Sequence, residues 1–311
     1  MAAPREELER QLTSYPAAHA FLTWVARTLG DELLGPMQQR ATRHGELFWR
    51  TLESSIRDMT ALFQPQPGDA APGDAPTARM EAMLAALHAQ ASKLPHKAVF
   101  TAFDEVLEAF YHQPIYPFME HFYYLGQHAL DRLACILELL DSSALAGRSR
   151  GRWCDIGAGP AVVLCSVLER LPRFTAVGYD VSDSCVDYAT RLLASRGLGL
   201  DRASIVRADG RSLPTPPAAF DLVVATEVVE HVPDPEVLLA EARRVLRPDG
   251  FLIASTPINL PWGPHLVVFR DADEVRALYQ RAGFACLRFV TEPLSPTAAL
   301  TFGLFAPQRP G

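Results

Sequence analysis

The chain has 311 residues, 49% of them hydrophobic, and a formal net charge of −7. This length allows one large domain or two smaller ones with a substantial core. The acidic balance and the lack of a dense Lys/Arg block argue against nucleic acid and against an anionic membrane, so we expect neither as a partner.

The cysteines and the N-terminus indicate a cytoplasmic protein. No C-x-x-C pair occurs, and an odd count of five is unlike a small disulfide scaffold, so we interpret the cysteines as reduced thiols. The N-terminal MAAPREELERQL lacks the apolar core of a signal peptide, and no apolar run reaches membrane-spanning length.

The first half of the chain has a helical pattern. Apolar residues recur at helical spacing over 5–62 and again from about residue 78. Between them, the Pro/Gly/Ala/Asp-rich run 64–77 predicts an exposed loop or disordered link. We expect region 1–149 to cap the domain that follows, to shape an acceptor pocket and to offer a surface for a homodimer.

From about residue 150 to 311, strand and helix patterns alternate. This alternation predicts an α/β fold with a doubly wound, mostly parallel sheet. The last two strands have no helix between them and should form an antiparallel pair at one edge. The predicted strands are 152–156, 174–179, 203–207, 220–226, 251–256, 284–291 and 298–305, and the helices between them are 160–170, 183–195, 235–246 and 273–282.

Several residues predict where these helices begin and end. Pro160 stands where a first helical turn would start, and its fixed backbone angle suits that position. Ser182 and Asp234 are candidate N-caps. Gly197 and Gly283 are candidate C-terminal stops.

A glycine loop follows the first predicted strand, in the run WCDIGAGP from Trp153 to Pro160. Glycines there let the backbone approach a ligand, and the next helix offers free N–H groups. Many nucleotide-binding proteins share this arrangement. The dinucleotide fingerprint needs a third glycine where this chain has Val162, which disfavours NAD and FAD.

Three further acidic elements follow predicted strands. They are Gly178–Ser182 (GYDVS), which contains Asp180, Ala208–Gly210 (ADG), and Phe220–Glu227 (FDLVVATE). Ligands of open α/β sheets bind outside the carboxyl ends of the strands, where all these elements fall. A single acidic residue at a strand end is more often a solvated turn or helix cap, so the argument depends on their order and number.

The run from 152 to about 260 resembles the class I S-adenosylmethionine-dependent methyltransferases, closest to the ubiquinone-biosynthesis type (methyltransferase type 11). The matching text is DIGAGP, GYDVS, ADG and FDLVVATEVVEHVPDPEVLLAEARRVLRPDGFLIASTP. The resemblance extends over residues 150–306. It implies a Rossmann-like, seven-stranded sheet and S-adenosyl-L-methionine as the methyl donor. The donor-binding roles that it implies fall on Asp155, Gly157, Gly159, Asp180, Val181, Asp209 and Glu227.

The chemistry of these residues suits that donor. Asp155 would help to hold the ammonium end, often through water. Asp180 can accept from both ribose hydroxyls, with Val181 against the adenine, and Asp209 can accept from the adenine amino group. Our candidate donor set also includes Ala158, Gly210, Thr226 and Tyr124.

Two histidines are candidates for the acceptor side. His231 follows the fourth predicted strand and could act as a general base, although we favour a structural role in which it packs locally and fixes the loop. His265, after the fifth strand, is the second catalytic candidate.

The aromatic segment Tyr111–Tyr124 precedes the sheet domain. Tyr123, Tyr124 and His121 could line the pocket, or could simply pack against the sheet domain. The histidine spacings match no metal motif, and we expect no metal site.

We therefore expect methyl transfer to O, N or C of a small molecule. A decarboxylase or cyclase of the same fold, a methyltransferase acting on a protein or peptide, and a non-catalytic donor-binding subunit are the alternatives; the intact donor elements argue against the last. The Ala/Arg/Pro-rich composition is typical of a GC-rich bacterial genome and hints at natural-product biosynthesis.

Overall fold

A computed structural model describes residues 14–28, 41–43, 45–63, 76–91, 93–95, 100, 102–123 and 129–308. The chain forms two compact units, one of residues 1–93 and 118–134 and one of residues 94–117 and 135–311. The sequence predicts a boundary at 149/150, whereas segments 94–117 and 135–149 fall within the larger unit. Among the described residues, no helix is both long and apolar enough to cross a membrane.

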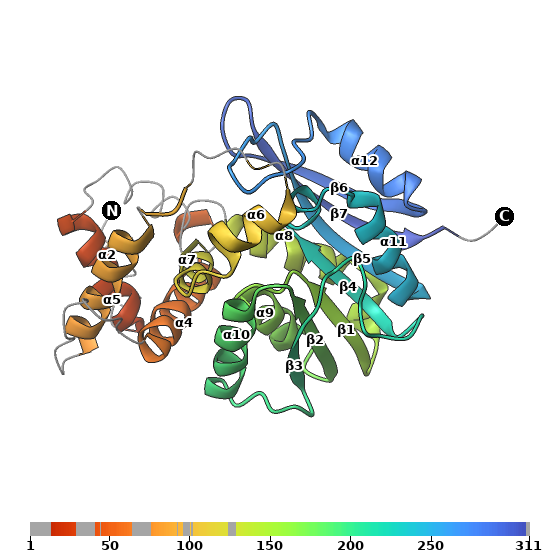
Figure 1. Cartoon of the computed structure of the whole chain (residues 1–311). Helices are drawn as coiled ribbons and strands as arrows, with labels where there is room; N and C mark the ends of the chain where they lie inside the picture. The colour runs from red at the N-terminus through yellow and green to blue at the C-terminus, as the bar shows by residue number, and fades with distance from the viewer. Residues whose placement is uncertain are drawn as a thin grey trace. The chain divides into compact units, whose positions relative to one another are not determined.

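The smaller unit contains helices packed on one another, as the spacing of apolar residues predicts. Helices α2 (Pro16–Thr28), α4 (Glu46–Leu62) and α5 (Pro76–Ala91) are in mutual contact (Figure 1). The carboxylate of Glu53, on α4, accepts a 2.8 Å hydrogen bond from the Ala18 N–H in the first turn of α2. Residues 64–75 of the expected loop lie outside the described residues, and Pro76 already begins α5. The buried apolar side chains include Phe21, Val25, Phe48, Trp49, Leu52, Ile56, Met59, Met83 and Leu84.

The larger unit is built on a seven-stranded sheet of order β3-β2-β1-β4-β5-β7-β6 (Figure 1). β1 to β5 are parallel, while β7 runs antiparallel to both β5 and β6. This is the predicted doubly wound fold with its antiparallel edge. The strands are β1 (Gly151–Ile156), β2 (Phe174–Asp180), β3 (Ala203–Arg207), β4 (Phe220–Thr226), β5 (Leu246–Ile258), β6 (Phe284–Pro293) and β7 (Ala299–Pro307), and the helices are α9 (Val162–Arg170), α10 (Asp183–Ser195), α11 (Pro235–Val245) and α12 (Ala272–Arg281).

The central strands are buried on both faces. Every residue of β4 is buried, as expected for a parallel strand between two layers of helices. Side chains alternate along a strand, so Cys154 and Ile156 face the same side and join the core beneath α11 and α12. The end of each strand is therefore held rigidly, which positions the loops that follow.

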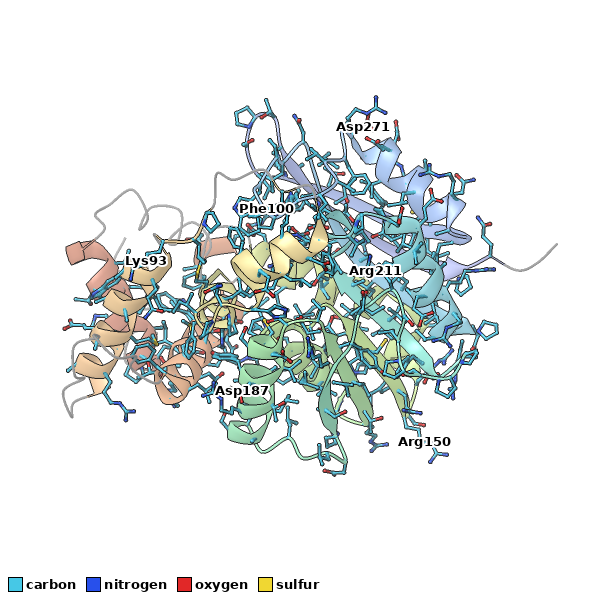
Figure 2. The ribbon with its side chains drawn as sticks, in the orientation of Figure 1. Lys93, Phe100, Arg150, Asp187, Arg211 and Asp271 are labelled. Atoms are coloured by element: carbon cyan, nitrogen blue, oxygen red, sulfur yellow. The ribbon has the colours of Figure 1, made fainter. Side chains whose placement is uncertain are left out.

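Local signals set most helix starts. Ser182 is the N-cap of α10, with its hydroxyl accepting from the Cys185 N–H, and Asp271 caps α12 (Figure 2). Pro235 occupies the first turn of α11, but the side chain of Asp234 makes no capping hydrogen bond, contrary to our expectation. Helix α9 begins at Val162 rather than at Pro160, because Ala161 adopts a left-handed conformation (φ 63°).

A short segment of the larger unit precedes the sheet in the chain. It comprises helix α6 (Phe103–Val106), a π-helical turn η1 (Leu107–Tyr111) and the first residues of α7 (Tyr116–Tyr123). The carbonyl of Tyr111 accepts hydrogen bonds from the hydroxyls of Ser182 and Ser184. These bonds hold the end of the π turn at the carboxyl end of β2.

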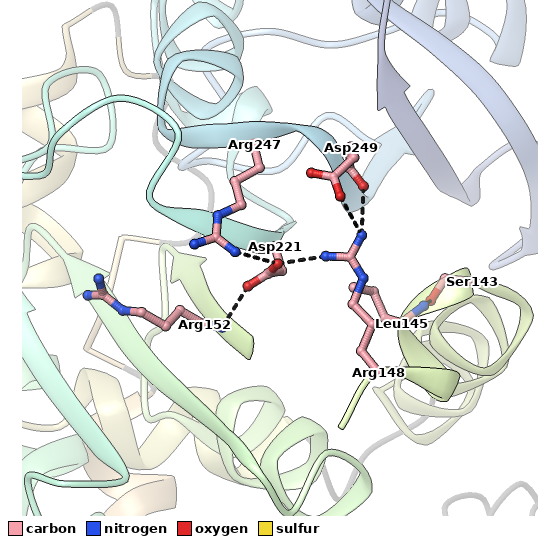
Figure 3. A network of polar contacts seen from close by, with 7 residues as sticks. All are labelled: Ser143, Leu145, Arg148, Arg152, Asp221, Arg247 and Asp249. Carbon is pink, nitrogen blue, oxygen red and sulfur yellow. Dashed lines mark hydrogen bonds and ion pairs between the residues drawn. The ribbon is translucent and has the colours of Figure 1, made fainter. Parts of the chain in front are cut away.

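A polar network lies at the amino ends of the central strands β1, β4 and β5 (Figure 3). The buried carboxylate of Asp221, at the start of β4, accepts from Arg148 at 2.6 Å, from Arg247 at 2.9 Å and from the Arg152 N–H at 2.9 Å. Arg148 also pairs with Asp249 at 2.8 Å. The network joins the chain just before β1 to β4 and to the start of β5.

Candidate functional site

The glycine loop and Asp180 form one hydrogen-bonded unit. Gly157 and Ala158 donate to the Tyr179 carbonyl at 2.8 and 3.0 Å. The two carboxylate oxygens of Asp180 accept from the Gly159 and Ser182 N–H groups, each at 2.8 Å. Burial raises the pKa of Asp180, and the backbone donors oppose this shift.

The glycines of this loop are required by its geometry. Gly157 and Gly159 have φ angles of 71° and 51°, in the left-handed region that favours glycine. A Cβ at Gly157 would lie 2.5 Å from Cγ2 of Val228, whereas a Cβ at Gly159 would meet nothing within 4 Å. The loop is therefore packed tightly on one side and open at Gly159.

Acidic side chains gather at the carboxyl ends of neighbouring strands. Asp155 is 1% exposed and is the penultimate residue of β1, which lies between β2 and β4. Glu227 directly follows β4, has a left-handed backbone (φ 55°), and accepts a 2.8 Å hydrogen bond from the Ser255 hydroxyl. Such backbone strain in a non-glycine residue is common at functional sites.

Asp209 lies in the turn after β3, as predicted, but its carboxylate already has a partner. Arg211 forms a two-pronged ion pair with it, at 2.6–3.1 Å (Figure 2). Burial would raise the pKa of Asp209, but the hydrogen bonds and charge of Arg211 outweigh it and lower that pKa. The guanidinium also lies 5.0 Å from the ring centroid of Phe103.

His231 and His265 lie side by side, with ring centroids 4.9 Å apart. His231 is in the short helical turn η3 (Val229–His231) after β4, and His265 is in the loop after β5. Nδ1 of His231 is 3.0 Å from the Pro264 carbonyl, and Nδ1 of His265 is 2.8 Å from the Leu260 carbonyl. Burial lowers the pKa of both, that of His231 to about 3 with help from the charge of His265.

Aromatic rings surround this pair. The Trp262 ring lies 5.5 Å from His265 and 6.1 Å from Phe110, and Tyr111 lies 5.7 Å from His231, all centroid to centroid. The segment that precedes the sheet therefore contacts this pair through Tyr111, while Phe110 packs against Trp262. Its place on the acceptor side stays a prediction.

Comparisons with known proteins identify the larger unit. Residues 154–254 match the family model described as a methyltransferase domain. The larger unit contains a class I methyltransferase domain. This finding confirms the predicted resemblance and the predicted fold.

Two curated relatives and one solved structure are similar to this chain. The chain is 31% identical over 170 residues to 27-O-demethylrifamycin SV methyltransferase of Amycolatopsis mediterranei, covering 49% of this chain and 58% of that protein. It is 34% identical over 143 residues to ubiquinone biosynthesis O-methyltransferase of Bradyrhizobium, covering 45% and 53%. The chain thus spans about half the length of these curated relatives.

The solved structure is that of a cyclase, SpnF. It aligns with a TM-score of 0.51 at 19% identity, covering 60% of this chain and 83% of that chain. At this identity the likeness concerns the fold alone.

The remaining predicted site residues fall in different parts of the chain. Ala158, Val181, Gly210 and Thr226 lie at the carboxyl ends of strands in the methyltransferase domain, with Gly210 packed so closely that a Cβ would lie 2.6 Å from Ile156. His121 is buried in the smaller unit. Tyr124 lies outside the described residues, and the side chain of Tyr123 is not described either.

The sequence analysis missed several residues of this region, among them Arg211, Phe110 and Glu230. Glu230 is completely buried, and its Oε1 lies 3.7 Å from Nε2 of His231. Its position could have been found, because β4 and β5 are neighbouring parallel strands and their carboxyl-end loops meet at one edge. We could therefore have expected Glu230 and His231, which follow β4, to lie close to His265, which follows β5.

Proposed function

We propose that the chain is an S-adenosylmethionine-dependent methyltransferase whose acceptor is an oxygen atom of a small, largely apolar molecule. The hydrogen bonds of the Asp180 carboxylate are the observation that carries the proposal. Each carboxylate oxygen of Asp180 has accepted one backbone N–H and keeps lone-pair capacity for a ligand hydroxyl. A ribose diol is such a ligand.

The charge of the site supports a cationic donor. Asp155 and Glu227 lie at the carboxyl ends of the neighbouring strands β1 and β4. S-adenosylmethionine presents an ammonium and a sulfonium group, and it supplies a methyl carbon already activated for displacement. We assign Asp155 and Glu227 to its positive end, Asp180 to the ribose, and the turn with Asp209 and Arg211 to the adenine side.

The acceptor side supports an apolar acceptor with a hydroxyl group. Tyr111 and Trp262 would hold it by ring contacts, with the buried Phe110 packed against Trp262, and His231 and His265 offer the polar atoms. Alignment of acceptor and donor is worth roughly 7–11 kcal/mol of the barrier. As the oxygen–methyl bond forms and the sulfur–methyl bond breaks, the hydroxyl proton must leave. A pKa of about 3 makes His231 a weak base for that proton.

The two named relatives support oxygen as the acceptor atom. One is named for the 27-O position of rifamycin and the other for O-methylation in ubiquinone biosynthesis. We extend this chemistry to the present chain, and propose natural-product biosynthesis as its setting.

Calorimetric titration with S-adenosylhomocysteine tests the donor site. We expect one molecule to bind per chain, and Asp180→Asn to weaken binding more than tenfold, since the amide cannot accept from both backbone N–H groups and from the ribose. Asp187 is an exposed carboxylate on α10 that is paired with Arg191 (Figure 2). Asp187→Asn is the matched control and should leave the affinity unchanged.

Failure of the folded chain to bind S-adenosylhomocysteine would sink the proposal. Reaction type is tested by incubating the protein and donor with a panel of phenols and alcohols. Accumulation of S-adenosylhomocysteine with an O-methylated product supports it, whereas a converted acceptor without S-adenosylhomocysteine indicates a non-methylating reaction.

A further inference from the structure

Glu230, His231 and His265 form a cluster that the donor site does not use. Each offers one ligand atom, and the three atoms lie within 4.8 Å of one another. Zinc–ligand bonds of roughly 2.0–2.2 Å place tetrahedral ligand atoms about 3.4 Å apart. The separation of Oε1 of Glu230 and Nε2 of His231, 3.7 Å, is close to this value. Small side-chain rotations would close the cluster on an ion.

The hydrogen bonds of the two imidazoles prepare them as ligands. A carbonyl oxygen only accepts, so Nδ1 of His231 must donate to Pro264, and Nδ1 of His265 must donate to Leu260. In the neutral tautomers that result, both Nε2 atoms carry a lone pair. Metal-binding histidines are oriented by this kind of bond from the other ring nitrogen.

The backbone holds the two loops together. The carbonyl of Glu230 accepts from the N–H groups of Leu266 and Val267, at 2.8 and 3.0 Å. The residue that supplies the carboxylate thus anchors the loop that carries His265. The spacing between the candidate ligands is built into the fold and does not depend on one exposed side chain.

We propose that Glu230, His231 and His265 bind a divalent transition metal ion. Two imidazoles and one carboxylate suit Zn²⁺, Fe²⁺ or Co²⁺ better than Mg²⁺ or Ca²⁺, which take mainly oxygen ligands. Three protein ligands leave coordination positions open, as in catalytic metal sites.

The role of the ion rests on the proposed function. Positive charge at this place would lower the pKa of an acceptor hydroxyl that contacts it. The hydroxyl proton would then pass to solvent water before methyl transfer, without a basic side chain.

The test begins with the full chain, stripped of metal by a chelator. Zn²⁺ affinity is measured by competition with a chromophoric chelator. We expect one ion per chain in the wild type and a loss of affinity of at least about 100-fold in His265→Asn and in His231→Asn. Asparagine can keep the hydrogen bond to the carbonyl while it removes Nε2. His19→Asn, which removes an exposed histidine of α2, is the matched control and should keep wild-type affinity.

Equal Zn²⁺ affinity in the wild type and in folded His265→Asn would overturn the metal site, as would less than one ion per wild-type chain. If the variants do not fold by circular dichroism, the absorption of Co²⁺ added to the wild type decides. Visible bands of a nitrogen-ligated, low-coordinate ion support the site, and the spectrum of hydrated Co²⁺ contradicts it. S-adenosylhomocysteine binding by the stripped chain shows independently whether the donor site is sound.

Discussion

His231 illustrates how burial decides the properties of a single side chain. Its ring is enclosed by His265, Trp262 and Tyr111, and the loss of water disfavours its charged form. Burial, followed by the charge of His265, lowers its pKa to about 3 from 6.5, although the Pro264 carbonyl opposes the shift. In the metal-free chain His231 is therefore neutral wherever the protein is folded and active.

A pH-dependent stability follows for the metal-free protein. Between pH 6.5 and 3 the unfolded chain binds a proton at His231 that the folded chain does not, so stability falls as the pH falls. We expect this residue to contribute about 1.4 kcal/mol per pH unit to that slope. Urea unfolding with a chelator present, compared between the wild type and His231→Asn, measures it. Parallel pH profiles for the two proteins would contradict the expectation.

At the residue scale, the sequence predicts some contacts and not others. The places of the glycines after β1 and of Asp180 at the end of β2 were predictable from the strand pattern, whereas their role in donor binding stays a prediction. The engagement of Asp209 by Arg211 was not, because a residue two positions away meets it only in this particular turn. Glu230 was missed because each ligand of its cluster looks ordinary alone, and only the pairing of β4 with β5 brings them together.

At the scale of elements, Ser182 connects two parts of the larger unit. Its hydroxyl accepts from the Cys185 N–H as the N-cap of α10 and donates to the carbonyl of Tyr111. The π turn that ends at Tyr111 presents this carbonyl. Non-standard helical turns of this kind often lie at functional sites, and no periodicity of the sequence distinguishes η1 from an ordinary α-helix.

We expect Ser182→Ala to lower stability by about 1 kcal/mol through loss of the cap. It should also loosen the π turn, so the amides of Leu107–His112 should exchange hydrogen faster, because only the Ser184 hydroxyl still donates to the Tyr111 carbonyl. Hydrogen-exchange mass spectrometry measures the effect. Ser166→Ala, which removes a hydroxyl bonded only within α9, is the control, and similar exchange in both variants would argue against the anchor.

Most strands and helices of the sheet were predicted to within two residues, because buried parallel strands alternate regularly with amphipathic helices. The largest difference is β5, which begins at Leu246 and not at 251 as predicted. Helix α9 also begins two residues later than predicted. The proline at 160 fits a first turn, but the left-handed Ala161 ends the glycine loop only after it. The turn of the glycine loop therefore delays the start of α9, although Pro160 favours the first turn of a helix.

At the scale of the whole molecule, the polar network and the candidate site lie at opposite ends of the parallel strands. The Asp221 network lies at the amino ends of β1 and β4 (Figure 3), whereas the candidate site lies at the carboxyl ends of the same strands. The division into two units was not predictable from composition, because segment 94–117 continues a helical pattern that begins in the smaller unit.

We expect Asp221→Ala to destabilise the protein by about 3 kcal/mol, since it leaves Arg148 and Arg247 without their shared, buried partner. S-adenosylhomocysteine affinity should not change. Asp249→Ala removes an exposed carboxylate from the same network and should cost less than about 1 kcal/mol. Denaturant midpoints and calorimetry test both statements, and equal losses in the two variants would contradict the assigned role of Asp221.

The bonds from the Glu230 carbonyl to Leu266 and Val267 have a consequence for engineering. These bonds use only backbone atoms, so they do not depend on which side chains, other than proline, replace Leu266 and Val267. The ends of the loop between Asn259 and Phe269 are themselves joined by a 2.6 Å hydrogen bond. Residues of this loop other than His265 can therefore be varied with its stem intact. Under the proposed function, such variants should differ in acceptor preference and keep the same affinity for S-adenosylhomocysteine.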